Sequence, residues 1–271
     1  MRGSSWAWAV AAVGMAALLA VPSLAVLASL AHPAHEIWAH LWRTQLPELI
    51  GNTLALVAGV GAGTLVVGAG LAWLLVTYRF PGCRALEWAL VLPLAMPAYV
   101  IGFALLGLFD FSGPVQSALR RWLGPGARLP EFRSYWGVVL TMTLVFYPYV
   151  YLLARAAFRE QGAATLETAR SLGRSRMRAF VAVTLPLARP SLVAGVSLAM
   201  MEALADFGTV ATFGYRTLTE AVYRVWYGMF DRAAAAQLAS LLLLFALCLL
   251  GLERWLRGRA RFTQNPRRGS P

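Results

Sequence analysis

The sequence predicts an all-α, polytopic membrane protein with six membrane-spanning helices and both termini in the cytoplasm. Hydrophobic residues make up 59% of the 271 residues and charged residues only 13%, whereas soluble domains have roughly 45–50% apolar and about 25% charged residues. The apolar residues gather in long uncharged stretches, and arginine is divided unequally among the segments between them. One soluble core of this size cannot hold such an apolar excess, so part of the surface must face lipid.

Six stretches are long and apolar enough to cross a bilayer, which takes about 20 helical residues. They cover about 6–30, 49–77, 88–109, 135–154, 190–212 and 233–252. The first stretch could instead be a cleaved signal peptide, because Arg2 precedes it. Its apolar run exceeds the roughly 7–15 residues of a usual signal sequence, so an uncleaved span is the favoured interpretation.

Helix-breaking residues occur inside these stretches, namely Pro22, Pro93, Pro97 and Pro148. Membrane helices tolerate proline because neighbouring helices satisfy the freed backbone groups. The second stretch also contains Gly59 and Gly63 in a GxxxG spacing. Small residues at this spacing allow two helices to approach closely, so we expect ordinary helix packing on this face.

The direction of the spans follows from arginine, which supplies every one of the 24 positive residues. With six spans, the side that holds both termini receives sixteen arginines and the other side eight. Because positive residues accumulate on the cytoplasmic side, both termini are predicted to be cytoplasmic. Residues 155–189 then form a large cytoplasmic loop, and residues 254–271 form a basic cytoplasmic tail.

The loop at 155–189 carries the most specific pattern. A helix is predicted from Glu160 to Leu172, with Gly173 placed to end it. Leu166, Ala169 and Gly173 share one face of this helix. A second helix is predicted from Ser175 to Thr184, with Pro186 stopping it.

Glu167-Thr168-Ala169, three residues, Gly173, nine residues and then Val183-Thr184-Leu185-Pro186 resembles the EAA signature of permease subunits of binding-protein-dependent ABC importers. Thr168 replaces the second alanine of that signature and Val183 replaces isoleucine. The resemblance implies the MetI-like permease fold and a coupling segment that docks on a cytoplasmic ATP-binding subunit. By the same resemblance, Glu167, Ala169 and Gly173 would form the docking corner, and Leu185 and Pro186 would set the return into the membrane.

The chain is also similar to ferric-iron importer permeases, and this resemblance is strongest from Glu167 to Leu241. It includes Glu202-Ala-Leu-Ala-Asp206-Phe-Gly-Thr-Val and Tyr223-Arg-Val-Trp-Tyr-Gly228. Thiamine and polyamine permeases share much of this pattern, so they remain alternatives. The resemblance also implies an external substrate-binding protein and a second permease half, in a homo- or heterodimer, since iron permeases are often double-length and this chain matches one half.

Glu202 and Asp206 are the only acidic residues inside a predicted span. They lie four positions apart, which would place them on one face of a continuous helix. Intramembrane carboxylates normally face protein or water. Either they line a translocation path, where oxygen ligands suit a hard cation, or they pair with Arg216 or Arg224 for structural reasons.

Other functions are disfavoured. The chain has no lysine, so it lacks the Walker A loop of an ATPase and is not expected to be an enzyme. His35 and His40 are five apart and do not form a zinc motif, so neither a metal nor another cofactor is expected. The arginines are dispersed among loops, which argues for lipid contact and against nucleic-acid binding. An ion-coupled secondary transporter with Glu202 and Asp206 as a proton relay remains an alternative of another class.

Overall fold

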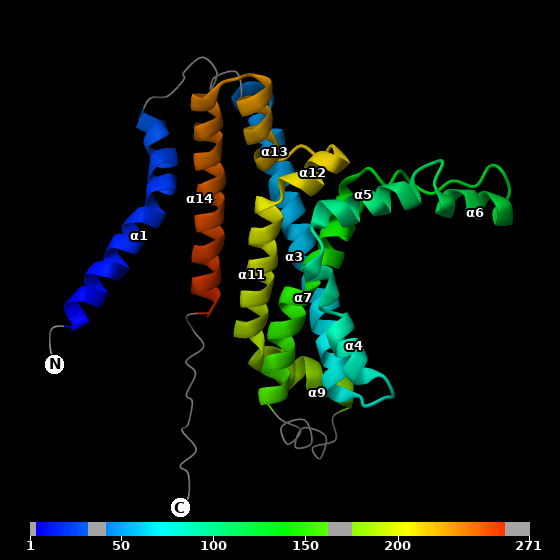
Figure 1. The fold of residues 1–271 in the computed structure, drawn as a ribbon. Coiled ribbons are helices and arrows are strands. Elements are labelled where there is room, and N and C mark those ends of the chain that lie inside the picture. Colours follow the sequence, from blue (N-terminus) through cyan, green and yellow to red (C-terminus); the bar gives the residue numbers. More distant parts are fainter. Residues whose placement is uncertain (1–3, 32–41, 162–174, 258–271) are drawn as a thin grey trace, which may run out of the picture. The chain divides into compact units, whose positions relative to one another are not determined.

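The computed structural model describes residues 4–31, 42–161 and 175–257, which are helical with connecting turns and contain no strand. Five segments are long and apolar enough to cross a membrane: 8–31 in α1 (Ser4–Ala28) and the following 3-10 turn, α3 (Leu46–Thr77), 98–123, α7 (Tyr135–Glu160) and α14 (Arg232–Arg257). A bent pair of segments, 176–187 and 189–205, makes a sixth when counted as one span. Figure 1 shows these helices.

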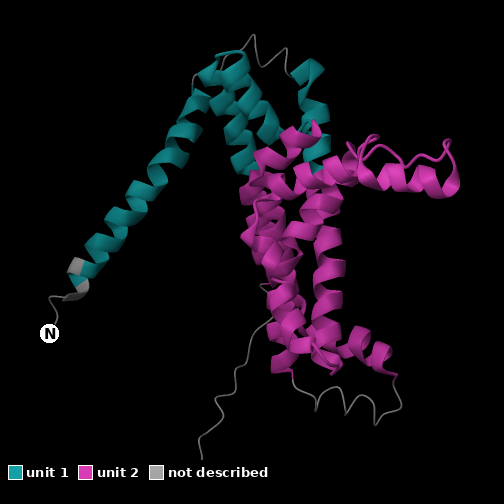
Figure 2. Cartoon of the chain, turned by 45° about the vertical axis from the view of Figure 1, so that its right-hand side comes forward, with its two compact units in different colours: residues 1–54, 216–245 teal, residues 55–215, 246–271 magenta. Residues whose placement is uncertain are grey.

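The chain divides into two compact units, which Figure 2 colours separately. Unit 1 comprises 1–54 and 216–245, and unit 2 comprises 55–215 and 246–271. Unit 1 contains α13 (Leu218–Tyr223) and a π-helical turn, Arg224–Gly228. Its core includes Leu46, Leu49, Leu218 and Leu238. Gln237 and Ser240 of α14 donate hydrogen bonds to the carbonyls of Ser29 and Val26, which tie α14 to the end of α1.

Unit 2 is built around α7, which is largely buried between α3 and α11 (Arg189–Ala205). Glycines allow both approaches: a Cβ on Gly68 of α3 would lie 2.8 Å from the carbonyl oxygen of Tyr147, and a Cβ on Gly195 of α11 would lie 2.8 Å from Cα of Val150. Gly59 and Gly63 face the same helix, as the GxxxG spacing predicts. One end of α7, at Glu160, leads toward the 162–174 segment, and we call it the loop end.

The stretch expected as one span over 88–109 is broken. Residues there form α4 (Cys83–Ala89), a 3-10 turn (Leu92–Ala95) and α5 (Ala98–Phe109). Pro93 lies within the turn and Pro97 caps α5, so two missing N–H groups within five residues interrupt the helical hydrogen bonds. Pro22 and Pro148, each alone, remain inside α1 and α7. After α5 the chain turns into α6 (Pro114–Leu123).

The expectation that Pro186 stops a helix is wrong. Helical backbone runs from α9 (Arg176–Ala179) through a π-helical turn (Phe180–Thr184) into α10 (Leu185–Leu187). Pro186 is the second residue of α10 and directly follows the π-helical turn, an irregularity of the helical hydrogen bonds that accommodates its missing N–H. The chain instead bends by 74° between 176–187 and 189–205, just before Pro190.

Candidate functional site

The sequence-predicted coupling residues are only partly within the described chain. Glu167, Ala169 and Gly173 lie outside the described residues. Leu185 and Pro186 lie in α10, in the segment that follows them.

This segment, 175–187, is held against the loop end of unit 2. The side-chain amide of Gln161 donates to the carbonyl of Thr184 at 3.2 Å. The ring of Phe180 packs against Trp73 of α3 and Phe158 of α7, with centroid separations of 5.0 and 5.6 Å. Met177, Val181 and Leu187 remain exposed on the same segment. It therefore has an anchored side and an open apolar side.

A charged cluster ties α4 to the same end of α7. The carboxylate of Glu87, which is 17% exposed, pairs with Arg155 and, at 2.8 Å, with Arg159. The hydrogen bond from Arg155 is the main cause that lowers the pKa of Glu87 below its ordinary value, although burial opposes it. Eight residues before Arg155 on α7, the Tyr147 hydroxyl donates to the carbonyl of Leu90, the residue that follows α4, at 2.9 Å. These contacts fix the chain where it enters the break after α4.

The break opens into a pocket of about 410 Å³ that contains both predicted path residues. Residues 94–99, Tyr149 of α7, Glu202 and Asp206 contribute to its lining. Glu202 is exposed, and its carboxylate has no ion pair or hydrogen bond among the residues that the structure describes. The pocket therefore offers one free carboxylate beside an aromatic hydroxyl.

Glu202 and Asp206 line the same pocket, but Asp206 stands where α11 ends and not inside a continuous helix. Asp206 ends α11 with an extended ψ of 92° and caps α12 (Phe207–Phe213). Its carboxylate accepts hydrogen bonds from the N–H and the hydroxyl of Thr209. Capping side chains adopt non-helical backbone angles, so the helix predicted over 190–212 breaks at this residue.

Arg216 and Arg224, the alternative partners of these acids in the sequence analysis, pair with other residues in unit 1. Arg216 lies 3.5 Å from Glu48, and Arg224 lies 3.7 Å from Glu220. Both guanidinium groups also donate to the side-chain oxygen of Gln45. His32, His35 and His40 lie outside the described residues, and the described ones hold no group of three or more His, Cys, Asp or Glu placed for a metal.

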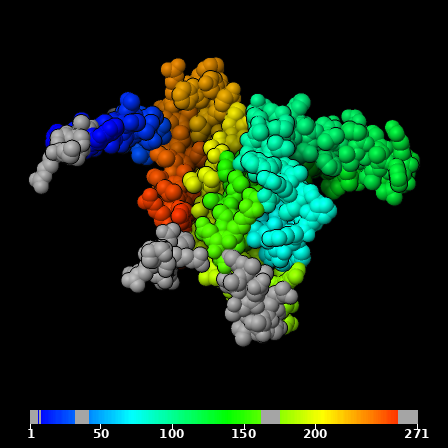
Figure 3. All heavy atoms as spheres, turned by 60° about the horizontal axis from the view of Figure 1, so that its bottom comes forward, coloured from blue at the N-terminus to red at the C-terminus, as the bar shows by residue number. Residues whose placement is uncertain are grey.

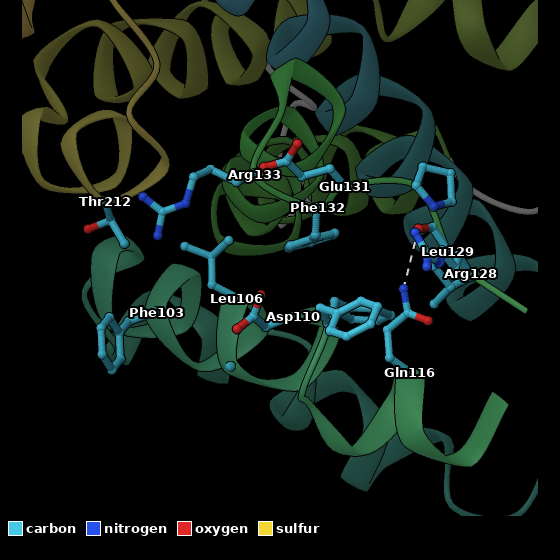
Figure 4. Close-up of a pocket in the computed structure, with 14 residues that line it drawn as sticks. Phe103, Leu106, Asp110, Gln116, Arg128, Leu129, Glu131, Phe132, Arg133 and Thr212 are labelled. Atoms are coloured by element: carbon cyan, nitrogen blue, oxygen red, sulfur yellow. Dashed lines mark hydrogen bonds between the residues drawn. The ribbon is translucent and has the colours of Figure 1, made fainter. Parts of the chain in front are cut away.

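A larger pocket, of about 670 Å³, lies at the end of unit 2 that is opposite the loop end, beside the junction of α5 and α6 (Figure 4). Its wall is mostly aromatic and aliphatic, from Phe103, Leu106, Phe109 and Phe132. Its polar groups come from both signs of charge: Asp110, Glu131, Arg128 and Arg133. Mixed charges over an apolar wall give no preference for one ionic substrate.

Sequence reasoning missed the Glu87 cluster, Tyr149 and the broken helix at 90–97. Glu87 is 68 residues from Arg155, so no local pattern connects them. The two closely spaced prolines were the available signal for the break.

An apolar helical bundle with helices broken around a carboxylate-lined pocket is typical of a membrane transport subunit. Residues 64–262 match the family of binding-protein-dependent transport system inner membrane components, and the chain belongs to this family. It is thus a multi-pass permease component of a bacterial inner membrane. The family assignment confirms the resemblance to permease subunits of binding-protein-dependent importers that the EAA-like pattern indicated.

Curated relatives carry several substrate names. The chain is 29% identical over 219 residues to the Fe(3+)-transport system permease protein FbpB 2 of Haemophilus influenzae, a match that covers 81% of this chain and 39% of that protein. It is 30% identical over 221 residues to the molybdenum transport system permease protein ModB of Escherichia coli K12, covering 79% and 93% of the two chains. It is 31% identical over 244 residues to the sulfate permease protein CysT of the same strain, covering 86% and 84%.

Solved structures support the fold. A bacterial ABC transporter for the import of alginate matches with a TM-score of 0.73 at 14% identity, over 94% of this chain and 95% of that one. The MetNI methionine ABC transporter, in inward-facing conformations, matches with a TM-score of 0.62 at 18% identity, over 84% and 100% of the chains. The expected MetI-like, all-α permease fold is therefore confirmed.

Proposed function

We propose that this chain is the permease subunit of an ATP-driven importer of ferric iron. An external binding protein would deliver the iron, and a cytoplasmic ATP-binding subunit would drive transport. A second permease half would complete the path. The single observation that favours iron is the exposed Glu202 carboxylate in the pocket between α5, α7 and α11, free of any described counter-ion.

The charge of the pocket supports a cationic substrate. Among the described residues, Glu202 and Asp206 are the carboxylic acids of its lining, and none of these lining residues is an arginine. In a medium of low dielectric constant, two carboxylates attract a cation and repel an anion. Oxygen ligands also suit a hard cation such as ferric iron.

The coupling role is assigned to the loop at 155–189. Segment 175–187 is attached to α3 and α7 through Phe180 and Gln161, while Met177, Val181 and Leu187 are uncovered. An exposed apolar patch offers a docking surface for a partner protein, and an anchored segment would transmit the partner's movement to the helices that hold it. Glu167, Ala169 and Gly173 would form the docking corner beside it, and closure of the ATPase would move α7 and α11 around the pocket.

An oxyanion importer is the second candidate, because relatives at 30% and 31% identity are named for molybdenum and sulfate transport. The carboxylate-lined pocket counts against it. Thiamine and polyamines remain weaker alternatives, as positively charged substrates that the same pocket would accept. Whichever of these substrates is transported, the chain itself would not be an enzyme, because the ATP-binding subunit would hydrolyse ATP.

The test is uptake of radiolabelled ferric iron, molybdate, sulfate, thiamine and putrescine in cells that lack this chain. Restoration of iron uptake alone by the intact chain supports the proposal. Glu202→Gln should then abolish iron uptake, and Glu202→Asp should retain part of it. Restored molybdate or sulfate uptake, insensitive to Glu202→Gln, would overturn the substrate and keep the permease class. Uptake without any ATP-binding subunit would favour a secondary transporter.

A further inference from the structure

Helix α6 is amphipathic with an unusual orientation. Its apolar residues recur at the helical spacing i, i+3, i+4, i+7 and i+8, so they share one half of the helix; they are Val115, Ala118, Leu119, Trp122 and Leu123. The other half carries Gln116, Ser117, Arg120 and Arg121. No acidic residue occurs on the helix.

Two polar residues of α6, Gln116 and Arg120, face the protein. Gln116 is 4% exposed, and its side-chain amide donates to the carbonyl of Leu129 at 3.3 Å. Arg120 donates to the carbonyl of Phe111 at 2.8 Å, and its guanidinium lies over the Phe111 ring at 4.5 Å. Of the polar residues, Arg121 is exposed.

Three apolar residues of α6 face outward, whereas Val115 and Leu119 are half-buried. Trp122 is 88% exposed, Leu123 is 72% exposed, and Ala118 is exposed between them. A helix surrounded by water would place these residues inward and its arginines outward. α6 instead exposes Ala118, Trp122 and Leu123 and turns Gln116 and Arg120 toward the protein, which indicates an apolar surrounding on its outer side.

The position of α6 along the bundle is fixed by an aromatic contact. Phe109, the last residue of α5, stacks on Phe132 with a centroid separation of 4.8 Å. Phe132 precedes the start of α7 at Tyr135 by three residues, and Trp136 in the first turn of α7 is exposed. Because α7 has 26 residues, it is about 39 Å long and exceeds the ~30 Å hydrocarbon core. Its first turn, and with it the junction of α5 and α6, therefore reaches the membrane–water interface.

The direction of α6 agrees with this position. In two views of unit 2, α6 runs across the direction of α7 and away from it (Figures 1 and 2). The space-filling view shows α5 and α6 as an arm that protrudes from the bundle of this unit (Figure 3). A helix that lies in the interface plane combines a Trp- and Leu-bearing apolar face with arginines at the headgroup level.

We propose that α6 is an interfacial helix whose Ala118–Trp122–Leu123 face inserts into the lipid of the membrane leaflet at the Tyr135 end of α7, opposite the loop end. Arg121 then contacts anionic phospholipid headgroups, while Gln116 and Arg120 hold the helix to the 124–134 segment. The arm would serve as a lateral anchor that keeps the outer end of α5, and the pocket of Figure 4, at a constant depth. This inference is independent of the transported substrate.

The test places a spin label on each face of α6 in the assembled transporter, in nanodiscs of phosphatidylglycerol and phosphatidylethanolamine. Cys83→Ser and Cys248→Ser remove the native thiols. Ala118→Cys reports the apolar face, and Arg121→Cys reports the polar border beside it. Trp122→Cys gives a second reading of the apolar face if Ala118→Cys does not assemble.

Collisions with oxygen, which partitions into lipid, are compared with collisions with a water-soluble nickel chelate. The proposal expects oxygen to dominate by several-fold at 118 and 122 and the nickel chelate to dominate at 121. Nickel-dominated collisions on both faces would show a solvated loop and overturn it. Positions 118 and 122 shielded from both reagents would show that a protein, either the second permease half or the binding protein, covers this face, and would overturn it as well.

Discussion

Asp206 accepts two hydrogen bonds from Thr209, one from its N–H at 2.9 Å and one from its hydroxyl at 2.5 Å. Both carboxylate oxygens are therefore engaged in starting α12, and the backbone leaves the helical conformation at Asp206. Glu202, one turn earlier, has no such partner in the described chain. Two acids four positions apart thus divide into a structural cap and a carboxylate without a partner in the described chain.

The first prediction follows from this division. Asp206→Ala removes the cap and should lower the free energy of unfolding by about 0.5–2 kcal/mol, whereas Asp206→Asn, a good capping residue, should cost less. Glu202→Gln should leave stability unchanged. The measurement is the thermal midpoint of the purified complex in nanodiscs. Equal losses for Asp206→Ala and Glu202→Gln would contradict the division of roles.

The long spans were predictable from the sequence because the bilayer itself sets their length. The second and fourth spans, expected at 49–77 and 135–154, fall within α3 and α7. Charged residues are costly in the hydrocarbon core, so long stretches without them mark the spans in the sequence.

The helix breaks and the polar contacts were not predictable in this way. A proline in a membrane helix either kinks it or ends it depending on its neighbours, and Pro148 and Pro97 differ in this respect. The cap at Asp206 requires knowledge of where α11 ends. The pairing of Glu87 with Arg155 depends on the packing of two helices that are distant in the sequence. The docking corner at Glu167, Ala169 and Gly173 lies outside the described residues and stays a prediction.

The second prediction concerns the close contact of α3 with α7. A Cβ on Gly68 would meet the backbone of Tyr147 and Tyr151 at 2.8 and 2.9 Å, and backbone atoms cannot move aside cheaply. Gly68→Ala should therefore destabilise the protein by about 1–3 kcal/mol. Gly70→Ala is the matched control, since nothing lies within 4 Å of its Cβ position, and it should gain up to ~1 kcal/mol. Thermal unfolding of both variants checks this, and a stabilised Gly68→Ala would show that α3 does not pack as described.

The third prediction tests coupling through the loop at 155–189. Gly173→Arg should reduce uptake to background while membrane insertion and assembly of the permease halves persist, because a long charged side chain cannot fit where another backbone must come close. Binding-protein-stimulated ATP hydrolysis should be lost in parallel. Gly126→Arg is the control, since its Cβ position has open space and uptake should persist. Normal uptake by Gly173→Arg would exclude docking at this corner.

The last prediction uses the Glu87 cluster, where the hydrogen bond from Arg155 lowers the pKa of Glu87. A lowered pKa in the folded protein means that ionised Glu87 stabilises the fold at pH above the unfolded pKa of about 4.3. This contribution is lost as pH falls through the lower folded pKa. Glu87→Gln should cost about 1–3 kcal/mol at pH 7, because it leaves the half-buried Arg155 without its charged partner. As pH falls below the folded pKa of Glu87, the wild type should approach the variant, because both then carry a neutral side chain at this position. Thermal midpoints of the two proteins, measured from pH 7 downward, check this, with Glu131→Gln, an exposed acid outside the cluster, as the control. A gap between wild type and Glu87→Gln that widens as pH falls would refute the stabilising role of the ionised cluster.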